Sequence, residues 1–233
     1  MDDQLGSIQW NGGVTALTNG NYVVSIPQWD NGSNTEAGAV AWGNGASGIT
    51  GEVSASNSLV GTTTDDQVGN GRLYEVPGVT ILPDGNYIVN SPNWKNGPYT
   101  GAVTWGNGAS GTVGAVSSDN SLVNTSANDE IFCESIITVY PNGIASIHFP
   151  GWSNGASYGA VSLISGPPNI TVGPLSSANS VLGNSSFGGD NMVSDYDTIY
   201  DQLIVGRPYD NKVTILHWWP DPTDWLFLPV VTK

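Results

Sequence analysis

The sequence predicts an all-β protein built from a tandem repeat, and a four-bladed β-propeller is the architecture that fits it best. A run of apolar residues around an Asn-Gly or Asp-Gly turn occurs three times, at 14–32, 79–97 and 137–155. Glycine is abundant, at 31 residues, and only 11 % of residues are charged, which suits short strands joined by tight turns. Nine tryptophans and 39 % hydrophobic residues are enough to form a packed core.

Each copy of the motif reads as a β-hairpin followed by a marked exit loop. Asn-Gly or Asp-Gly between two apolar runs is the strongest short-range hairpin signal. The second run always ends in Pro-x-Trp-x-Asn-Gly. In the first copy we expect four strands, near 14–18, 21–26, 38–42 and 51–60.

The repeat extends beyond the hairpin. Gly-Ala-Val follows the exit loop in all three copies, at 38–40, 101–103 and 159–161, and an Asn-Ser-Leu-Val or Asn-Ser-Val-Leu segment follows at 57–60, 120–123 and 179–182. The Asp residues of the return turns give the period: 63 residues from Asp3 to Asp66, 63 to Asp129 and 61 to Asp190. We therefore expect a single repeat domain, 1–233, with units near 1–63, 64–126 and 127–188 and a shorter, degenerate terminal unit at 189–233.

Four antiparallel strands in about 60 residues is the make-up of one propeller blade. A repeat of this length also fits a β-solenoid, or a partial propeller completed by oligomerisation. The short fourth unit is rich in large apolar residues (Trp218, Trp219, Trp225 and Phe227). It fits either a terminal cap or a blade that residues 1–10 complete, which would remove exposed sheet edges.

Charge and apolar content exclude several functions. The net charge is −15, with five Lys and Arg against twenty Asp and Glu, so there are too few cations to bind nucleic acid or an anionic membrane. No apolar run reaches the roughly 18 residues of a membrane span, so we expect no membrane insertion. No signal peptide precedes Asp2, so we expect a fragment or a mature chain. Cys133 is the single cysteine, lies in an apolar context, and is expected to be a small buried side chain.

The segments 17–25, 54–61 and 101–108 resemble a bacterial surface repeat. Similar units occur in tandem in large filamentous-haemagglutinin-like adhesins. The resemblance covers about residues 2–188, is specific in the first two units and fades in the third. It implies a bacterial extracellular or cell-surface location and a role in adhesion, and it supplies no catalytic residues.

The Pro-x-Trp-x-Asn-Gly loops are the candidate binding sites, because an indole ring beside amides and carboxylates is suited to neutral sugars. Several weak, equivalent sites would add avidity. The alternative is that these tryptophans fill the gap between units and that Asn-Gly only turns the chain. The candidate residues are Trp29, Asp30, Asn31, Trp94, Asn96, Trp152 and Asn154.

Asp66, Asp129 and Asp190 are candidate Ca²⁺ ligands in the return turns, since Ca²⁺ prefers carboxylate and carbonyl oxygens. None of these turns matches the twelve-residue calcium-loop pattern. The alternative is that the Asp side chains bond local backbone amides and shape the turn. We expect no other cofactor.

Signals for catalysis are scarce, and we expect no enzyme. The two histidines, His148 and His217, lie in apolar strands, and there is no Gly-x-Ser-x-Gly elbow, phosphate loop or two-His metal motif. The favoured hypothesis is a non-enzymatic, lectin- or adhesin-like module that binds neutral glycans or a cell-surface partner. The alternatives are a purely structural or interaction repeat and a glycan-processing enzyme, which would require paired carboxylates.

Overall fold

The computed structural model describes residues 13–71, 77–97, 99–124, 135–153, 158–167, 170–186, 188–217 and 227–230. Within these ranges the chain forms strands, turns and two 3₁₀ turns, at Gly189–Asn191 and Pro208–Asp210. No helix of this part of the chain has the length and apolar character to cross a membrane. The prediction of an all-β repeat protein is confirmed.

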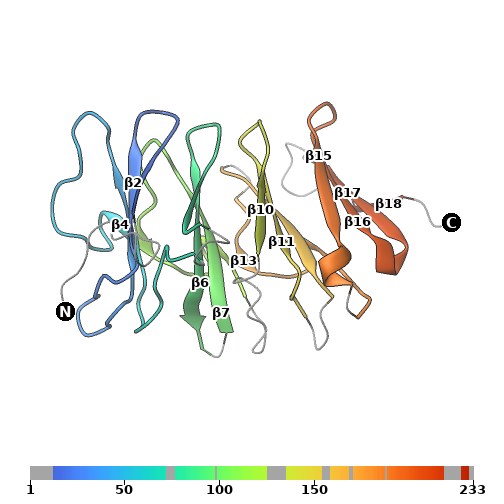
Figure 1. Cartoon of the computed structure of the whole chain (residues 1–233), viewed down its shortest axis with the longest axis horizontal. Helices are drawn as coiled ribbons and strands as arrows, with labels where there is room; N and C mark the ends of the chain where they lie inside the picture. Colours follow the sequence, from blue (N-terminus) through green and yellow to red (C-terminus); the bar gives the residue numbers. More distant parts are fainter. Residues whose placement is uncertain are drawn as a thin grey trace.

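The strands form four small sheets, one for each predicted unit. In Figure 1 the sheets follow one another along the long axis, with the first and the fourth sheet at opposite ends of the row. The four units therefore form an open, propeller-like array, as in the predicted alternative of a partial propeller, and the described residues do not close a ring. The segment 1–10, which we expected to complete the last blade, lies outside the described residues.

Each sheet is a meander of four antiparallel strands. The first contains β1 (Gly13–Ala16), β2 (Tyr22–Ile26), β3 (Ala39–Gly43) and β4 (Ser58–Val60). The second contains β5 (Val79–Ile81), β6 (Tyr87–Asn96), β7 (Tyr99–Gly106) and β9 (Ser121–Val123). The third contains β10 (Ile136–Val139), β11 (Ala145–Phe149), β12 (Ala160–Ile164) and β14 (Ser180–Leu182). The fourth contains β15 (Val193–Asp197), β16 (Gln202–Arg207), β17 (Lys212–His217) and β18 (Phe227–Val230).

The first two sheets each gain a fifth strand from the following unit. β8 (Gly114–Ala115) runs parallel to β4, and β13 (Gly173–Pro174) runs parallel to β9. Consecutive units are therefore joined by backbone hydrogen bonds as well as by side chains. A sequence pattern of period two gives no sign of so short a strand.

The fourth strand of the first unit is shorter than predicted. We expected residues 51–60, but only Ser58–Val60 pairs with β3. The side chain of Asn57 holds the preceding residues in a loop, because its amide group donates to the Glu52 carbonyl at 2.9 Å and its carbonyl accepts from Ser54 N at 2.9 Å. Such local bonds compete with strand pairing.

The predicted Asn-Gly hairpins form with three-residue loops. In the first, Leu17 N donates to Asn21 O at 2.8 Å, and Gly20 N donates to Leu17 O at 3.2 Å. Gly20 has a φ of +87°, the left-handed conformation that a type I turn followed by a bulge requires. The equivalent glycines of the next two units, Gly85 and Gly143, have φ values of +91° and +82°.

Three apolar clusters hold the array together, and each lies between consecutive sheets. The first joins unit 1, through residues such as Val23 and Leu59, to Tyr87 and Trp94 of unit 2. The second joins units 2 and 3, and the third joins units 3 and 4. Each sheet between two neighbours therefore buries both of its faces, which explains why its strands alternate so little between apolar and polar residues.

A cross-strand pair explains why Tyr and Gly recur together in the first two units. Tyr87 lies opposite Gly106, and a Cβ atom on Gly106 would lie 2.1 Å from the tyrosine ring. The same pair occurs in unit 1. In unit 3 the sizes are reversed, because Ala145 lies opposite Ile164. The position requires one large and one small side chain, in either order.

We predict that this pair behaves as a unit on mutation. Tyr87→Ala removes a fully buried ring, at a cost of about 3–5 kcal/mol of unfolding free energy, and Gly106→Ile overpacks the site by about 1–3 kcal/mol or more. The double variant recreates the unit 3 pair, so its loss should be smaller than the sum, by about 0.5–3 kcal/mol. Urea unfolding of the four proteins measures this, and strictly additive losses would contradict the explanation.

Candidate functional site: the junctions between repeat units

Two of the three tryptophans of the predicted binding loops are buried between units. Trp94 is 6 % exposed and belongs to the cluster between sheets 1 and 2, and Trp152 is 9 % exposed and belongs to the cluster between sheets 2 and 3. Trp29, in the first unit, is half-buried. An indole ring that is covered by a neighbouring sheet has no free face for a sugar, so Trp94 and Trp152 act as packing residues.

The polar residues of the first loop bind the chain itself. The Asp30 carboxylate accepts from Glu36 N at 2.8 Å, and the Asn31 amide group donates to Gly61 O at 2.8 Å. Asn96 is in strand β6, but its side chain is outside the described part of the chain, as is Asn154. In the first of the three predicted loops, Asp30 and Asn31 are therefore engaged in contacts within the chain.

The repeated Trp-Gly-Asn-Gly segment is a contact between units 1 and 2. The carbonyl oxygen of Gly108 accepts three hydrogen bonds from unit 1: from Asn19 at 2.8 Å, from Asn21 at 2.9 Å and from the Trp42 indole at 2.9 Å. A side chain on Gly108 would place a Cβ atom 1.7 Å from Gly85 O. Glycine is required there because two backbone segments approach so closely.

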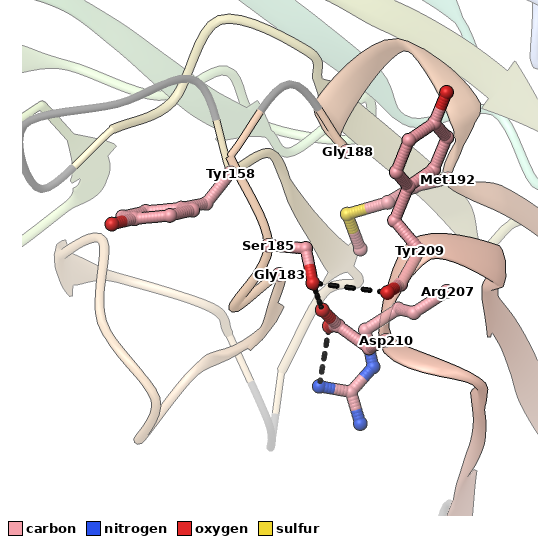
Figure 2. Close-up of a pocket in the computed structure, with 8 residues that line it drawn as sticks. All are labelled: Tyr158, Gly183, Ser185, Gly188, Met192, Arg207, Tyr209 and Asp210. Atoms are coloured by element: carbon pink, nitrogen blue, oxygen red, sulfur yellow. Dashed lines mark hydrogen bonds and ion pairs between the residues drawn. The ribbon is translucent and has the colours of Figure 1, made fainter.

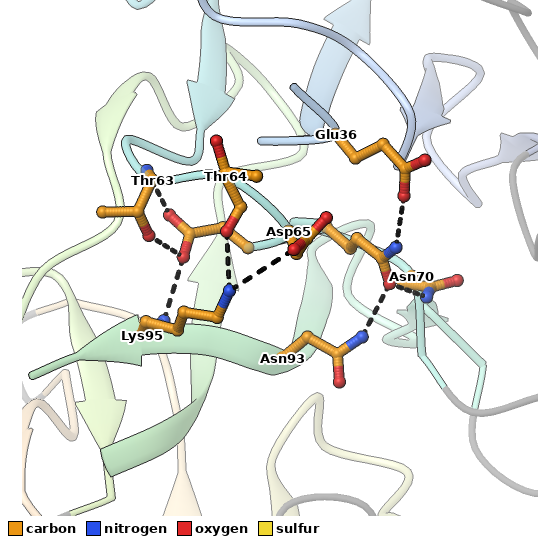
Figure 3. Close-up of polar contacts among 9 residues, drawn as sticks. Glu36, Thr63, Thr64, Asp65, Asn70, Asn93 and Lys95 are labelled. Carbon is orange, nitrogen blue, oxygen red and sulfur yellow. Dashed lines mark hydrogen bonds and ion pairs between the residues drawn. The ribbon is translucent and has the colours of Figure 1, made fainter. Parts of the chain in front are cut away.

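Asp66 shapes the return turn and leaves no room for a metal ion. Its side chain is fully buried, and its carboxylate accepts from the backbone amides of Thr62 at 2.9 Å, Thr63 at 2.8 Å and Lys95 at 3.0 Å, and from the Thr63 hydroxyl. Figure 3 shows the bonds from Thr63 and Lys95. Lys95 belongs to β6 of the second sheet, whereas Thr62 and Thr63 follow β4 of the first sheet, so one carboxylate fixes both the turn and the junction. Hydrogen bonds to an ionised acceptor are the strong kind.

The remaining predicted metal ligands do not form a site in the described structure. Asp190 is exposed in a 3₁₀ turn, and Asp129 lies outside the described residues, as does Cys133. No group of three or more His, Cys, Asp and Glu side chains within the described ranges is arranged to hold a metal ion.

We predict that Asp66→Ala lowers the unfolding free energy by about 3 kcal/mol, because several buried donors lose their acceptor. Asp65→Asn is the matched control. The Asp65 side chain is 60 % exposed, and Asn tolerates the φ of +63° there, so its effect should stay within about 0.5 kcal/mol. Thermal unfolding with and without Ca²⁺ completes the test. A Ca²⁺-dependent rise in Tm that Asp66→Ala abolishes would contradict the structural role.

Gln67 connects three segments beside Asp66. Its side-chain amide donates to the Glu36 carboxylate at 2.7 Å, and its side-chain carbonyl accepts from Asn93 of β6 at 2.6 Å and from Asn70 at 2.8 Å (Figure 3). Glu36 and Asn93 come from consecutive units. The acid-rich return turn, which the sequence suggested as a ligand site, is part of a hydrogen-bond network that joins the units.

A different lock joins units 3 and 4. Arg207 of β16 donates from Nη1 to the Leu182 carbonyl of β14 at 2.8 Å and from Nη2 to Thr214 at 2.7 Å. Asp210 lies 3.7 Å from Nη1 (Figure 2). It also accepts from Asn184 N at 3.0 Å. An arginine fork suits such a position because it satisfies several acceptors at once.

The hollow around this lock is too small for a ligand. It is a partly open depression, and its empty volume of about 150 Å³, between residues such as Tyr158, Met192 and Arg207, includes open solvent (Figure 2). Ligand pockets commonly measure about 300–1,000 Å³. We therefore interpret the lining residues as a packed junction.

His148 is a third contact at the junction of units 3 and 4. Its Nε2 lies 2.9 Å from the Gly189 carbonyl oxygen, which can only accept, so Nε2 carries the hydrogen. Burial lowers the pKa of His148 below its usual value of 6.5, against the opposing effects of the Gly189 carbonyl and Asp190. The ring therefore favours the neutral form in the folded state. His217 ends strand β17, and its side chain is outside the described part of the chain.

We predict that this junction weakens in mild acid. The folded-state pKa is lowered, so the unfolded chain binds the proton more readily, and the unfolding free energy falls as the pH drops through about 6.5. His148→Gln keeps a donor for Gly189 and should flatten the slope between about pH 7.5 and 5.5. Urea unfolding across this range measures it. A slope that is equal in both proteins would contradict the assignment to His148.

Several of the residues that join the units were missed by sequence reasoning. The donated strands, the Arg207 contacts and the bonds to the Gly108 carbonyl were not predicted. A signal was present: Gly51, Gly114 and Gly173 recur at one position of each unit, and a repeated glycine with positive φ marks a special backbone conformation. The packing role of the tryptophans was weighed from the sequence.

The fold and the junctions define the class of protein: an all-β, propeller-like array of stacked repeat units. The chain belongs to a family described as a repeat of unknown function (DUF5650), which matches residues 16–70, 81–132 and 142–192. No curated protein matches the chain.

Two solved structures are similar over almost the whole chain. Selenomethionine-substituted virginiamycin B lyase from Staphylococcus aureus shares 12 % identity at a TM-score of 0.38, over 96 % of this chain and 56 % of that one. Endo-1,5-alpha-L-arabinanase from Thermotoga petrophila RKU-1 shares 15 % identity at a TM-score of 0.30, over 96 % of this chain and 62 % of that one. This chain therefore spans about three fifths of either protein. Similarity at this level carries no argument about activity.

Proposed function

We propose that this chain is a non-enzymatic structural and interaction repeat of a bacterial extracellular or cell-surface protein. One observation carries the proposal: the repeated tryptophan and aspartate side chains that would serve a binding site are used to stack the units. Trp94, Trp152 and Asp66 are all buried at junctions. Residues repeated for stacking are what a rigid spacer or display scaffold requires.

The surface composition supports this role. The chain is acidic, with a net charge of −15, and its other polar residues are mostly uncharged, which favours solubility and contact with neutral partners. The resemblance to filamentous-haemagglutinin-like adhesins supports a surface location. The partner we propose for this role is a cell-surface protein, and not nucleic acid.

A second candidate function, binding of a neutral glycan, is favoured by one loop. Trp29 is half-buried, and Asp30 and Asn31 stand beside it. This first loop has the exposure that a sugar-stacking ring needs, unlike its counterparts in units 2 and 3. Only one such site would exist in the described array, so avidity would require several chains.

A pair of variants separates the two roles. Trp94→Ala should lower the unfolding free energy by about 3–5 kcal/mol, because it empties a buried site. Trp29→Ala should cost clearly less. Chemical unfolding of both variants gives these values. Similar losses, or a Trp94→Ala loss under about 1 kcal/mol, would contradict the structural role.

A glycan array probed with the wild-type chain completes the test, with Ca²⁺ present and absent. The structural role predicts no binding to neutral glycans. Binding that disappears in Trp29→Ala while the fold is retained would establish the second candidate. Hydrolysis of an arrayed glycan would overturn the non-enzymatic proposal.

A further inference from the structure

The donated strands have a counterpart in the first unit. In units 2 and 3 a short segment after the third strand leaves its own sheet and pairs with the preceding one, as β8 and β13. The 63-residue period places Gly51 at the position of Gly114 and Val53 at the position of Val116. Residues 51–53 are therefore the donor segment of unit 1.

This segment already has the conformation of a donated strand. The three donor segments share a glycine with positive φ: Gly51 (+88°), Gly114 (+101°) and Gly173 (+91°). They also share an asparagine whose amide group donates to the carbonyl of the residue after that glycine: Asn57 at 2.9 Å, Asn120 at 2.8 Å and Asn179 at 3.0 Å. The loop of unit 1 is thus preorganised for pairing, which reduces the entropy lost on binding.

No strand receives the segment in the described structure. Val116 N donates to Val60 O at 3.0 Å, and Leu175 N donates to Val123 O at 2.9 Å. Val53 has no such acceptor within the described ranges, and Gly51 and Glu52 are exposed. Among the described residues, Val53 N is therefore a backbone donor without the ladder partner that its counterparts have.

The sheet face beside this segment is covered only in part. Val14 is 68 % exposed, whereas Val79, its counterpart in unit 2, packs against the cluster between sheets 1 and 2. Trp29 is half-buried, whereas Trp94 is buried. Ala39 and Val60, the counterparts of Ala102 and Val123, are buried, so Val14 and Trp29 are the accessible positions of this face.

The other end of the array is built differently. The Leu182 carbonyl occupies the position of Val60 O and Val123 O, but it accepts from the Arg207 side chain. The last edge strand, β18, contains Pro229, which has no N–H group and is a residue that blunts sheet edges. In the described part of the fourth unit, β18 therefore offers a poor edge to the donor segment of a second copy.

We propose that residues 51–53 and the outer face of the first sheet are a docking surface for one further repeat unit of this family. That unit would receive residues 51–53 as a parallel fifth strand, with Val53 N donating to the carbonyl at its Val60 position. Its apolar face would cover Val14 and Trp29. This is strand addition of the kind used in peptide recognition, with a whole repeat unit as the partner. This inference rests on the proposed scaffold role and adds to it that further units join the array at the first sheet.

A fusion of an extra copy of residues 1–63 to the start of the full chain tests this. The join keeps the period, because Met1 falls at the position of Thr64. A Val53→Ile change in the added copy separates the two copies by mass in hydrogen exchange. In the unfused chain the Val53 amide should exchange as fast as an exposed loop. In the fusion it should slow to within an order of magnitude of Val116.

Two proline substitutions in residues 51–53 of the original copy test the role of the Val53 amide. Val53→Pro removes the donor, so the fusion should lose the protection of residues 51–53 and part of its gain in Tm. Glu52→Pro is the matched control, because unit 3 has Pro174 at this position and pairs normally. Glu52→Pro should leave the Leu59 and Trp29 regions as protected as in the unsubstituted fusion.

The outcomes decide the proposal. An added copy that stays unprotected throughout, or a fusion in which Val53 still exchanges fast, would overturn it. Concentration-dependent protection of Val53 in the unfused chain, with dimers in sedimentation velocity, would also overturn it, because the occupant would then be a second copy. The scaffold role itself is tested by other measurements, namely the unfolding of Trp94→Ala and the glycan array. The failure of one proposal can therefore be distinguished from the failure of the other.

Discussion

The pairing of each donated strand with the preceding sheet is the constraint on which the array depends. A single unit of about 60 residues has two sheet faces and too little apolar volume to cover both. The parallel pairs at β8 and β13 fix how far each sheet is shifted relative to its neighbour. Trp94 and Trp152 then fill the space between the sheets. Stability is thus shared between neighbours, as in other repeat proteins.

Much of the fold follows from the sequence, because the hairpins depend on local chemistry. The three Asn-Gly or Asp-Gly turns have glycines with positive φ, and the strands around them pair as expected. The strand donation does not follow, because two paired residues leave no periodic pattern. The closed ring was expected from unit number alone. Whether the repeats close into a ring depends on the angle between neighbouring sheets, and side-chain packing determines that angle.

The candidate site was only partly predictable for a related reason. A periodic Trp beside Asn and Asp has the chemistry of a sugar site, but burial decides its role, and burial depends on the neighbouring unit. Asp66 illustrates the point. Its residue type fits Ca²⁺, yet its carboxylate oxygens accept hydrogen bonds from backbone amides of two units. Arg207 had no counterpart in the other units, so repeat comparison gave no reason to single it out.

Hydrogen exchange of the Val116 and Leu175 amides, the two donors from the transferred segments, tests the central claim most directly. If strand donation joins the units, both amides should be protected as strongly as those of the central strands β6 and β7, because they open only when neighbouring units separate. Exchange of Val116 and Leu175 at the rate of exposed loops, with β6 and β7 still protected, would contradict the account. The units would then be joined by side-chain packing alone.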